Sequence, residues 1–85
     1  MNILELAEIV RVAAEKRVDA ILGHSRRRHY GHAAMLAATC VPLAPKAVEH
    51  DFRAWLAGLR EAHSRRHAFR DELTKALDNL GVRSI

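Results

Sequence analysis

The chain has 85 residues, enough for one domain with a single modest core and too few for a deep, enclosed active site. Nearly half of the residues (49%) are apolar, but only four are aromatic, so the core must be built from aliphatic side chains. Many alanines and leucines, with two prolines and four glycines, favour helices. A single cysteine, Cys40, excludes an internal disulfide and a cysteine-rich zinc site.

The charge balance is mildly basic, with fourteen Lys and Arg against ten Asp and Glu, a formal charge of +4. Eleven of the fourteen cations are arginines, whose planar guanidinium fits carboxylates and phosphates. The alternative is an ordinary solvated surface. Glu5 and Glu8 interrupt the first apolar stretch, so no signal peptide is predicted, and no apolar run is long enough to cross a membrane. We therefore expect an intracellular, cytoplasmic protein.

The first helix is predicted from about Ile3 to Leu22. Asn2 is the expected N-cap, with Glu5 at the spacing of a capping box, and Gly23 is the expected left-handed stop. Its apolar positions recur at helical spacing and form a broad face: Leu6, Ile9, Val10, Ala13, Ala14, Val18 and Ile21. A face this broad can contact a second copy as well as the core, so homodimer formation is a further hypothesis.

The second helix is predicted from about Arg28 to Val41, with Ser25 as a candidate N-cap and Pro42 as its end. The run 33–38 carries no charge, so this helix should be central. The third helix should begin at Pro45 or Lys46 and end at Ala62.

Within the third helix, Trp55 is expected in the core, and the interior Gly58 predicts a close crossing of another helix. Ser64 should cap the fourth helix, from about Arg65 to Leu80, and Gly81 should end it, leaving a short tail (82–85) that is open to fraying.

These elements predict an all-α fold in one domain (1–85), with four helices arranged as two stacked antiparallel helical hairpins. Hairpin one spans about 3–41 and hairpin two about 46–80. The halves share a helix–basic junction–helix pattern, in which His24 and His63 stand thirty-nine residues apart, as in helical-hairpin repeats. Two hairpins can bury the faces that neither buries alone.

The two basic junctions, 24–29 and 63–66, are the candidate binding site. Cations at the start of a helix oppose its dipole, so arginines there indicate contact with an anionic partner. The alternative is that they cover the end of the bundle or pair with neighbouring acids. The predicted partner-binding residues are Arg26, Arg27, Arg28, Tyr30, Arg65, Arg66 and Arg70.

Other chemistry finds little support in the sequence. The pairs His29/His32 and His63/His67 have helical spacing for a metal, but the arginines around them repel a cation, so no metal site is predicted. Ser64 has a sufficient role as a cap, and no orienting acid accompanies it. Since there is also no phosphate-binding glycine loop, we expect neither an enzyme nor a cofactor.

Residues 28–34 (RHYGHAA) followed by 59–66 (LREAHSRR) resemble a helical segment of bacterial SWIM-type zinc-finger proteins and related uncharacterised proteins. There, a basic-Tyr-x-x-Ala-Ala helix precedes a Leu-Arg-x-x-His-x-Arg-(Lys/Arg) junction and a final helix. The resemblance covers roughly residues 26–77. The zinc motif of that family needs three cysteines and a histidine, and it is absent here. The resemblance therefore implies a helical-repeat architecture with an accessory or scaffolding role.

The function expected from the sequence is a small, non-enzymatic interaction module that binds an acidic protein partner through its arginine-rich end. The alternative is an accessory protein that binds nucleic acid with the same basic surface. The two differ in the salt dependence of binding to DNA or RNA, because neutralised phosphates release counterions.

Overall fold

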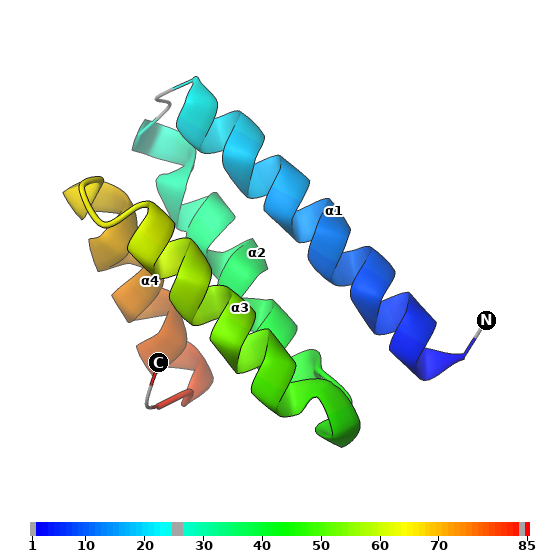
Figure 1. The fold of residues 1–85 in the computed structure, drawn as a ribbon. Helices are drawn as coiled ribbons and strands as arrows, with labels where there is room; N and C mark the ends of the chain where they lie inside the picture. Colours follow the sequence, from blue (N-terminus) through cyan, green and yellow to red (C-terminus); the bar gives the residue numbers. More distant parts are fainter. Residues whose placement is uncertain (1, 25–26, 84) are drawn as a thin grey trace.

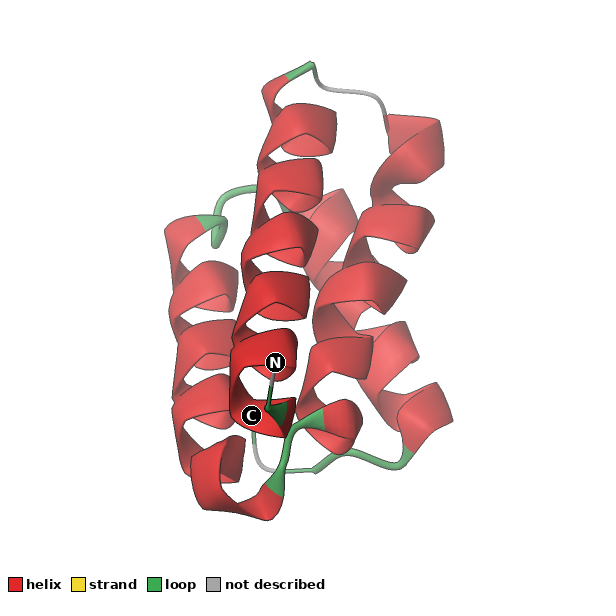
Figure 2. Ribbon diagram, turned by 90° about the vertical axis from the view of Figure 1, so that its right-hand side faces the viewer, coloured by secondary structure: helices red, strands yellow, loops and turns green. Residues whose placement is uncertain are grey.

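The computed structural model describes residues 2–24, 27–83 and 85, and all the regular structure in this part of the chain is helical (Figure 2). The elements are α1 (Ile3–Gly23), the 3-10 turn η1 (Arg27–His29), α2 (Tyr30–Leu43), the 3-10 turn η2 (Lys46–Val48), α3 (Glu49–Ala62) and α4 (His67–Leu80). The all-α prediction with four helices is confirmed. Ser25, a predicted cap, lies outside the described residues, as does Arg26.

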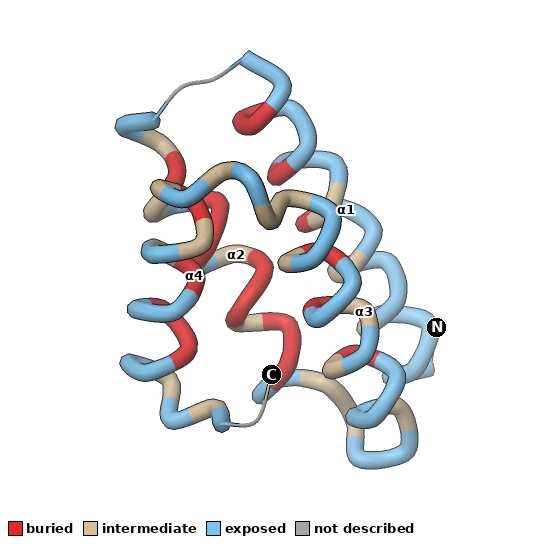
Figure 3. The backbone as a smooth tube through the Cα atoms, turned by 60° about the vertical axis from the view of Figure 1, so that its left-hand side comes forward, coloured by how far each residue is buried: buried red, intermediate tan, exposed pale blue. Residues whose placement is uncertain are grey.

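Helix α2 is the centre of the bundle, as its charge-free sequence predicts. It packs most closely against α4 and α1 and more loosely against α3 (Figures 1 and 3). Small side chains on opposite sides of α2 are fully covered, among them Ala33, Ala34, Ala37 and Ala38. Because alanine adds so little width, neighbouring helices approach α2 from several sides. Leu56, Phe69 and Leu73 then fill the core around it.

Helix α1 is buried only over its C-terminal half. Asn2 caps it as predicted, since the Asn2 side chain accepts a hydrogen bond from the Glu5 backbone N–H at 2.8 Å. Part of the predicted broad apolar face is open, because Leu6, Ile9 and Val10 are each about half exposed (52%, 52% and 48%). The buried positions lie further along the helix: Ala14, Val18, Ile21 and Leu22.

The indole of Trp55 joins α3 to the middle of α1. It is half-buried, and its Nε1 donates a hydrogen bond to the Glu15 carboxylate, while the Arg11 guanidinium lies 5.5 Å from the ring centroid. The prediction of a core tryptophan is therefore correct in part, since Trp55 packs against the core but stays partly exposed. The indole N–H needs a polar partner when it is covered, and Glu15 supplies it.

Two predicted helix ends differ from the structure. Gly23 is the last residue of α1 and not a left-handed stop, since the only described glycine with positive φ is Gly81. Helix α2 includes Pro42 and ends one residue later. The chain turns at Ala44, which is extended (φ −64°, ψ 135°) because it precedes Pro45. Pro45 accordingly stands before η2 and is not the first residue of a helix.

Helix α4 begins at His67, two residues later than predicted, and Ser64 does not cap it. Ser64 lies in the preceding turn, where its carbonyl accepts a hydrogen bond from Arg70 Nη1 at 3.1 Å. The other end agrees with the prediction, since Gly81 is left-handed (φ 71°). Val82 N–H bonds to the Leu77 carbonyl at 2.9 Å, the pattern of a Schellman motif.

The close helix crossing predicted at Gly58 is not present in the structure. Nothing lies within 4 Å of a methyl group built on Gly58, which is exposed. A methyl group on Gly31 would instead lie 3.2 Å from the Glu72 carboxylate of α4. Gly31 on α2 therefore adjoins the end of a side chain of α4, whereas Gly58 on α3 faces open space.

The described residues of the C-terminal tail (82, 83 and 85) are held against α3 and the core. Arg53 donates to the Arg83 carbonyl at 2.7 Å, and Arg60 donates to the Ile85 carbonyl at 2.8 Å. Val82 and Ile85 are half-buried against the core. None of the helices in the described part of the chain is long and apolar enough to cross a membrane.

Candidate functional site

The two basic junctions lie at the same end of the bundle, where α1 turns into η1 and α3 turns into α4 (Figure 1). Residues from both junctions line one shallow hollow of about 280 Å³. It is bounded by Arg27, Tyr30, Arg65, Arg66, His67 and Ala68. We call this feature the arginine hollow. The thirty-nine-residue repeat in the sequence thus has a spatial counterpart, because both copies of the basic segment reach this end.

Tyr30 anchors the arginine hollow. Its ring is buried (4% exposed) and meets Phe69 edge-on, with ring centroids 6.2 Å apart. Its hydroxyl accepts a hydrogen bond from Arg66 Nη1 at 3.4 Å, which joins α2 to the second junction. Tyr30 therefore positions an arginine and offers little ring surface to a ligand.

The predicted arginines have different roles. Arg70 serves the fold, because it binds the Ser64 carbonyl of its own junction. Arg27, Arg65 and Arg66 line the hollow, and Arg28 is exposed outside it. In the described part of the chain, none of these last four arginines has a carboxylate at ion-pair distance. The idea that they pair with neighbouring acids is therefore not supported.

His63 connects the second junction to the end of α1. Its ring packs edge-on against Phe69 with centroids 5.8 Å apart, and its Nε2 lies 4.0 Å from the Asp19 carboxylate. Burial and, secondly, the nearby Arg66 charge lower the pKa of His63, and Asp19 only partly opposes them. The imidazole is therefore biased toward its neutral form.

The histidine pairs do not converge on one place. His67 lines the arginine hollow, His63 faces Asp19 and Phe69, and His32 lines a different surface between α1 and α2. Among the described residues, no group of three or more histidines, cysteines or acids is arranged to hold a metal ion.

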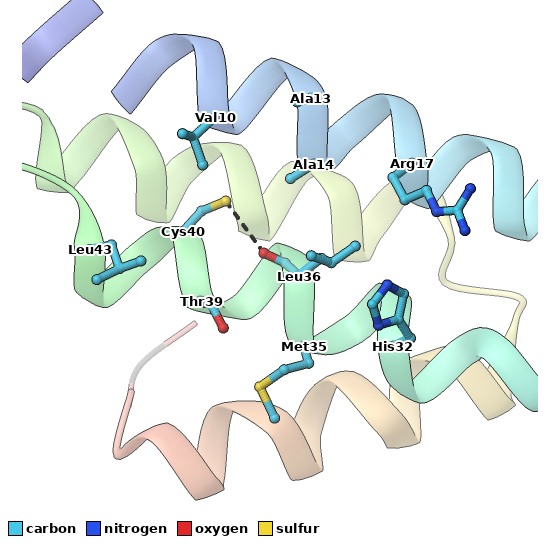
Figure 4. Close-up of a pocket in the computed structure, with 10 residues that line it drawn as sticks. All are labelled: Val10, Ala13, Ala14, Arg17, His32, Met35, Leu36, Thr39, Cys40 and Leu43. Carbon is cyan, nitrogen blue, oxygen red and sulfur yellow. Dashed lines mark hydrogen bonds between the residues drawn. The ribbon is translucent and has the colours of Figure 1, made fainter. Parts of the chain in front are cut away.

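A second candidate surface is an open apolar groove of about 480 Å³ between α1 and α2, which we call the α1–α2 groove (Figure 4). Ala13, Ala14 and Cys40 are among the residues that line it, and Arg17 and His32 lie together at one end. Burial raises the pKa of the Cys40 thiol, whose Sγ lies 3.4 Å from the Leu36 carbonyl. Cys40 is therefore a small apolar packing residue here and not a reactive thiolate.

Exposed apolar side chains are concentrated at this groove. A smaller hollow of about 240 Å³ continues it toward the N-terminus of α1. Of the eight large apolar side chains exposed in the described structure, five line these two hollows: Ile3, Leu6, Val10, Met35 and Leu43. The sequence indicated the α1 half of this surface as a broad apolar face. The α2 half was missed, although residues 32, 36, 39 and 43 have the spacing of one helix face.

Comparison with known proteins yields no matching family model, no matching curated protein and no matching solved structure. The resemblance to the helical segment of SWIM-type proteins therefore stays a prediction from the sequence.

Proposed function

We propose that this chain is a small, non-enzymatic helical interaction module of the cytoplasm that binds an acidic protein partner through the arginine hollow. The observation that carries the proposal is the gathering of Arg27, Arg65 and Arg66 in one hollow without carboxylate partners in the described chain. Two of these side chains, Arg27 and Arg65, are exposed and can turn toward a ligand.

Helix electrostatics support an anionic ligand. Helix α4 begins at His67 without a side-chain cap, immediately after Arg65 and Arg66. The positive end of its dipole and both guanidinium groups thus attract the same charge. These cations lower the stability of the helix start, and an acidic partner would relieve that cost. Guanidinium groups bind carboxylates through two parallel hydrogen bonds, which gives geometric specificity.

Nucleic acid is the competing ligand for the same arginines. Single-stranded nucleic acids are usually held by bases that stack on exposed aromatic rings. Two rings line the hollow: Tyr30 is buried, and only the smaller imidazole of His67 is exposed, so little stacking surface is offered, which favours a protein ligand. A duplex bound through phosphates alone needs no stacking, so a binding test must include it.

The double variant Arg27→Glu/Arg66→Glu tests the proposal. The affinity of this variant for a short polyglutamate peptide should be about tenfold lower or more, because two charge-assisted contacts are lost. Titration calorimetry at low salt measures this affinity. Far-UV circular dichroism should show an intact helical fold. The matched control is Lys46→Glu/Lys75→Glu, which also lowers the formal charge from +4 to 0 but changes exposed residues away from the hollow.

The proposal is overturned if the lysine variant loses as much affinity, since binding would then follow net charge alone. It is also overturned if a random-sequence duplex binds, with a steep salt dependence, and the peptide does not. In that case the arginines contact phosphates, and the ligand is nucleic acid. Unfolding of the arginine variant would show that these side chains are structural, which equally removes the basis of the proposal.

A further inference from the structure

The α1–α2 groove is lined by two regularly spaced rows of side chains, one on each helix, which are apolar except for Arg17, His32 and Thr39. On α1, residues 3, 6, 10, 13 and 17 follow each other at spacings of three and four, and all five line the groove or its continuation. On α2, residues 32, 36, 39 and 43 do the same. Alternating spacings of three and four are those of a coiled-coil seam, in which every such side chain meets another helix.

Two adjacent antiparallel helices with such seams form half of a four-helix bundle. In the described chain, no helix covers this side of α1 and α2, since the groove is open and its large side chains are exposed. We propose that a second copy of this chain covers it. The α1–α2 pair of one copy packs on that of the other, and the two grooves form one shared core.

The size of the surface is sufficient for such a dimer. At about 1.5 Å per residue and about 10 Å per helix width, α1 and α2 present roughly 500 Å² in each copy. Two copies bury about 1,000 Å², the lower limit for a specific interface. The same patch on both chains is what a two-fold symmetric interface requires.

Charge determines which two-fold arrangement is allowed. Arg17 and His32 lie together at one end of the groove (Figure 4). A two-fold axis parallel to the helices would place Arg17 of one copy against the partner's His32 and bring the cationic ends together. An axis across the helices places α1 antiparallel to the partner's α1, so the two cationic ends lie far apart. Val10, the middle of the α1 seam, then faces the partner's Val10.

This dimer is independent of the proposed ligand of the arginine hollow, which is formed by other residues. The chain offers two matched pairs of variants to test it. Leu6→Glu and Val10→Glu place a carboxylate in the groove. Leu4→Glu and Val12→Glu make the same changes in the same helix at exposed positions that do not line it (43% and 37% exposed).

Light scattering coupled to size exclusion should show the wild-type mass rising from one to two times 9.5 kDa with concentration. Samples from about 1 µM to about 1 mM cover weak and moderate affinities. The two groove variants should remain monomeric, and the two controls should dimerise like the wild type, all with the same circular dichroism spectrum. High salt should not dissociate the dimer, because its core is apolar, and Arg27→Glu/Arg66→Glu should not affect it.

A positive readout comes from Val10→Cys under mild oxidation, which should give a disulfide-linked dimer, whereas Val12→Cys should not. The wild type, whose Cys40 is buried, is the background control. A wild type that stays monomeric throughout the concentration range overturns the proposal. Dimerisation of the groove variants, or loss of the dimer in the controls, overturns the assignment to this face. Equal cross-linking at both cysteine positions overturns the antiparallel arrangement.

Discussion

The two halves of α1 have similar composition and opposite surroundings. In the C-terminal half, Val18, Ile21 and Leu22 are almost completely covered (0%, 6% and 1% exposed). In the N-terminal half, Ile3 and Leu6 are more than half exposed, although the apolar spacing is just as regular (Figure 3). In this half, the small Ala7 packs against the satellite cluster and the Arg11 guanidinium lies over the Trp55 ring.

The side of the helix pair that these side chains face explains the difference. Ile3 and Leu6 lie beside Leu43 of α2, but they line an open hollow that no described helix covers. The C-terminal half of α1 adjoins the main core and the junction end, whereas only a small satellite cluster around Ala14, Cys40 and Phe52 lies beneath the rest. Apolar periodicity thus predicts a face, and the neighbouring elements determine how much of it is buried.

The largest expected contrast is between the same substitution in the two halves. Leu22→Ala should lower the free energy of unfolding by about 2–5 kcal/mol, because it leaves a cavity in the core. Leu6→Ala should change it by about 0.5 kcal/mol or less when the protein is dilute enough to be monomeric. Urea unfolding followed by circular dichroism measures both.

If Leu22→Ala does not fold, a milder core variant can take its place in the comparison with Leu6→Ala. Ile21→Val should cost about 0.5–1.5 kcal/mol. A cost for Leu6→Ala as large as that for Leu22→Ala would mean that the N-terminal half is covered within one chain, contrary to the structure.

A smaller contrast separates a covered glycine from an uncovered one. Gly58→Ala should raise the free energy of unfolding by about 0.5–1 kcal/mol, because the site is open and alanine favours the helix. Gly31→Ala should raise the free energy of unfolding by less, because its methyl group must displace the Glu72 carboxylate, which would lie 3.2 Å away. Thermal unfolding of the two variants side by side tests the order. A larger gain at Gly31 would contradict the contact of this position with the Glu72 carboxylate.

The smallest expected effect is the pH dependence from His63, which packs at the covered end of α1. Because folding lowers its pKa, the unfolded chain binds this proton more readily than the folded one. The stabilisation is complete above the unfolded pKa, about 6.5, and is lost as the pH falls through the folded pKa. His63→Gln should therefore flatten the fall in stability between about pH 7 and pH 5. An unchanged slope would show that another histidine is responsible.

Local signals predicted some helix ends and not others. Gly81 was predicted correctly because a left-handed glycine satisfies the last carbonyls of α4 locally. Gly23 has the same position relative to its apolar stripe, yet it is the last residue of α1, and the C-cap His24 has φ −94°. Ser64 had the right residue type for a cap, but its junction is held instead by the hydrogen bond from Arg70. A cap depends on the conformation of one residue, which the surrounding turn can override.

The candidate sites, like the helix ends, were only partly predicted from the sequence. The sequence identified the arginines of both junctions, and the structure brings Arg27, Arg65 and Arg66 into one hollow. It did not separate Arg70, which binds its own backbone, from its neighbours. The sequence indicated only the α1 side of the α1–α2 groove, because the role of Met35 and Leu43 on α2 depends on what lies beside that helix.

The sequence by itself determined that the chain is all-α with four helices, that the alanine-rich helix is central, and that basic residues flank two helix starts. Helical periodicity, side-chain volume and charge decide these features over short stretches of chain. Only the tertiary structure decided that the two basic junctions meet, that the Glu72 side chain of α4 lies against Gly31 of α2, and that half of the apolar face of α1 remains open. These features depend on the packing of helices distant in sequence, which no local pattern encodes.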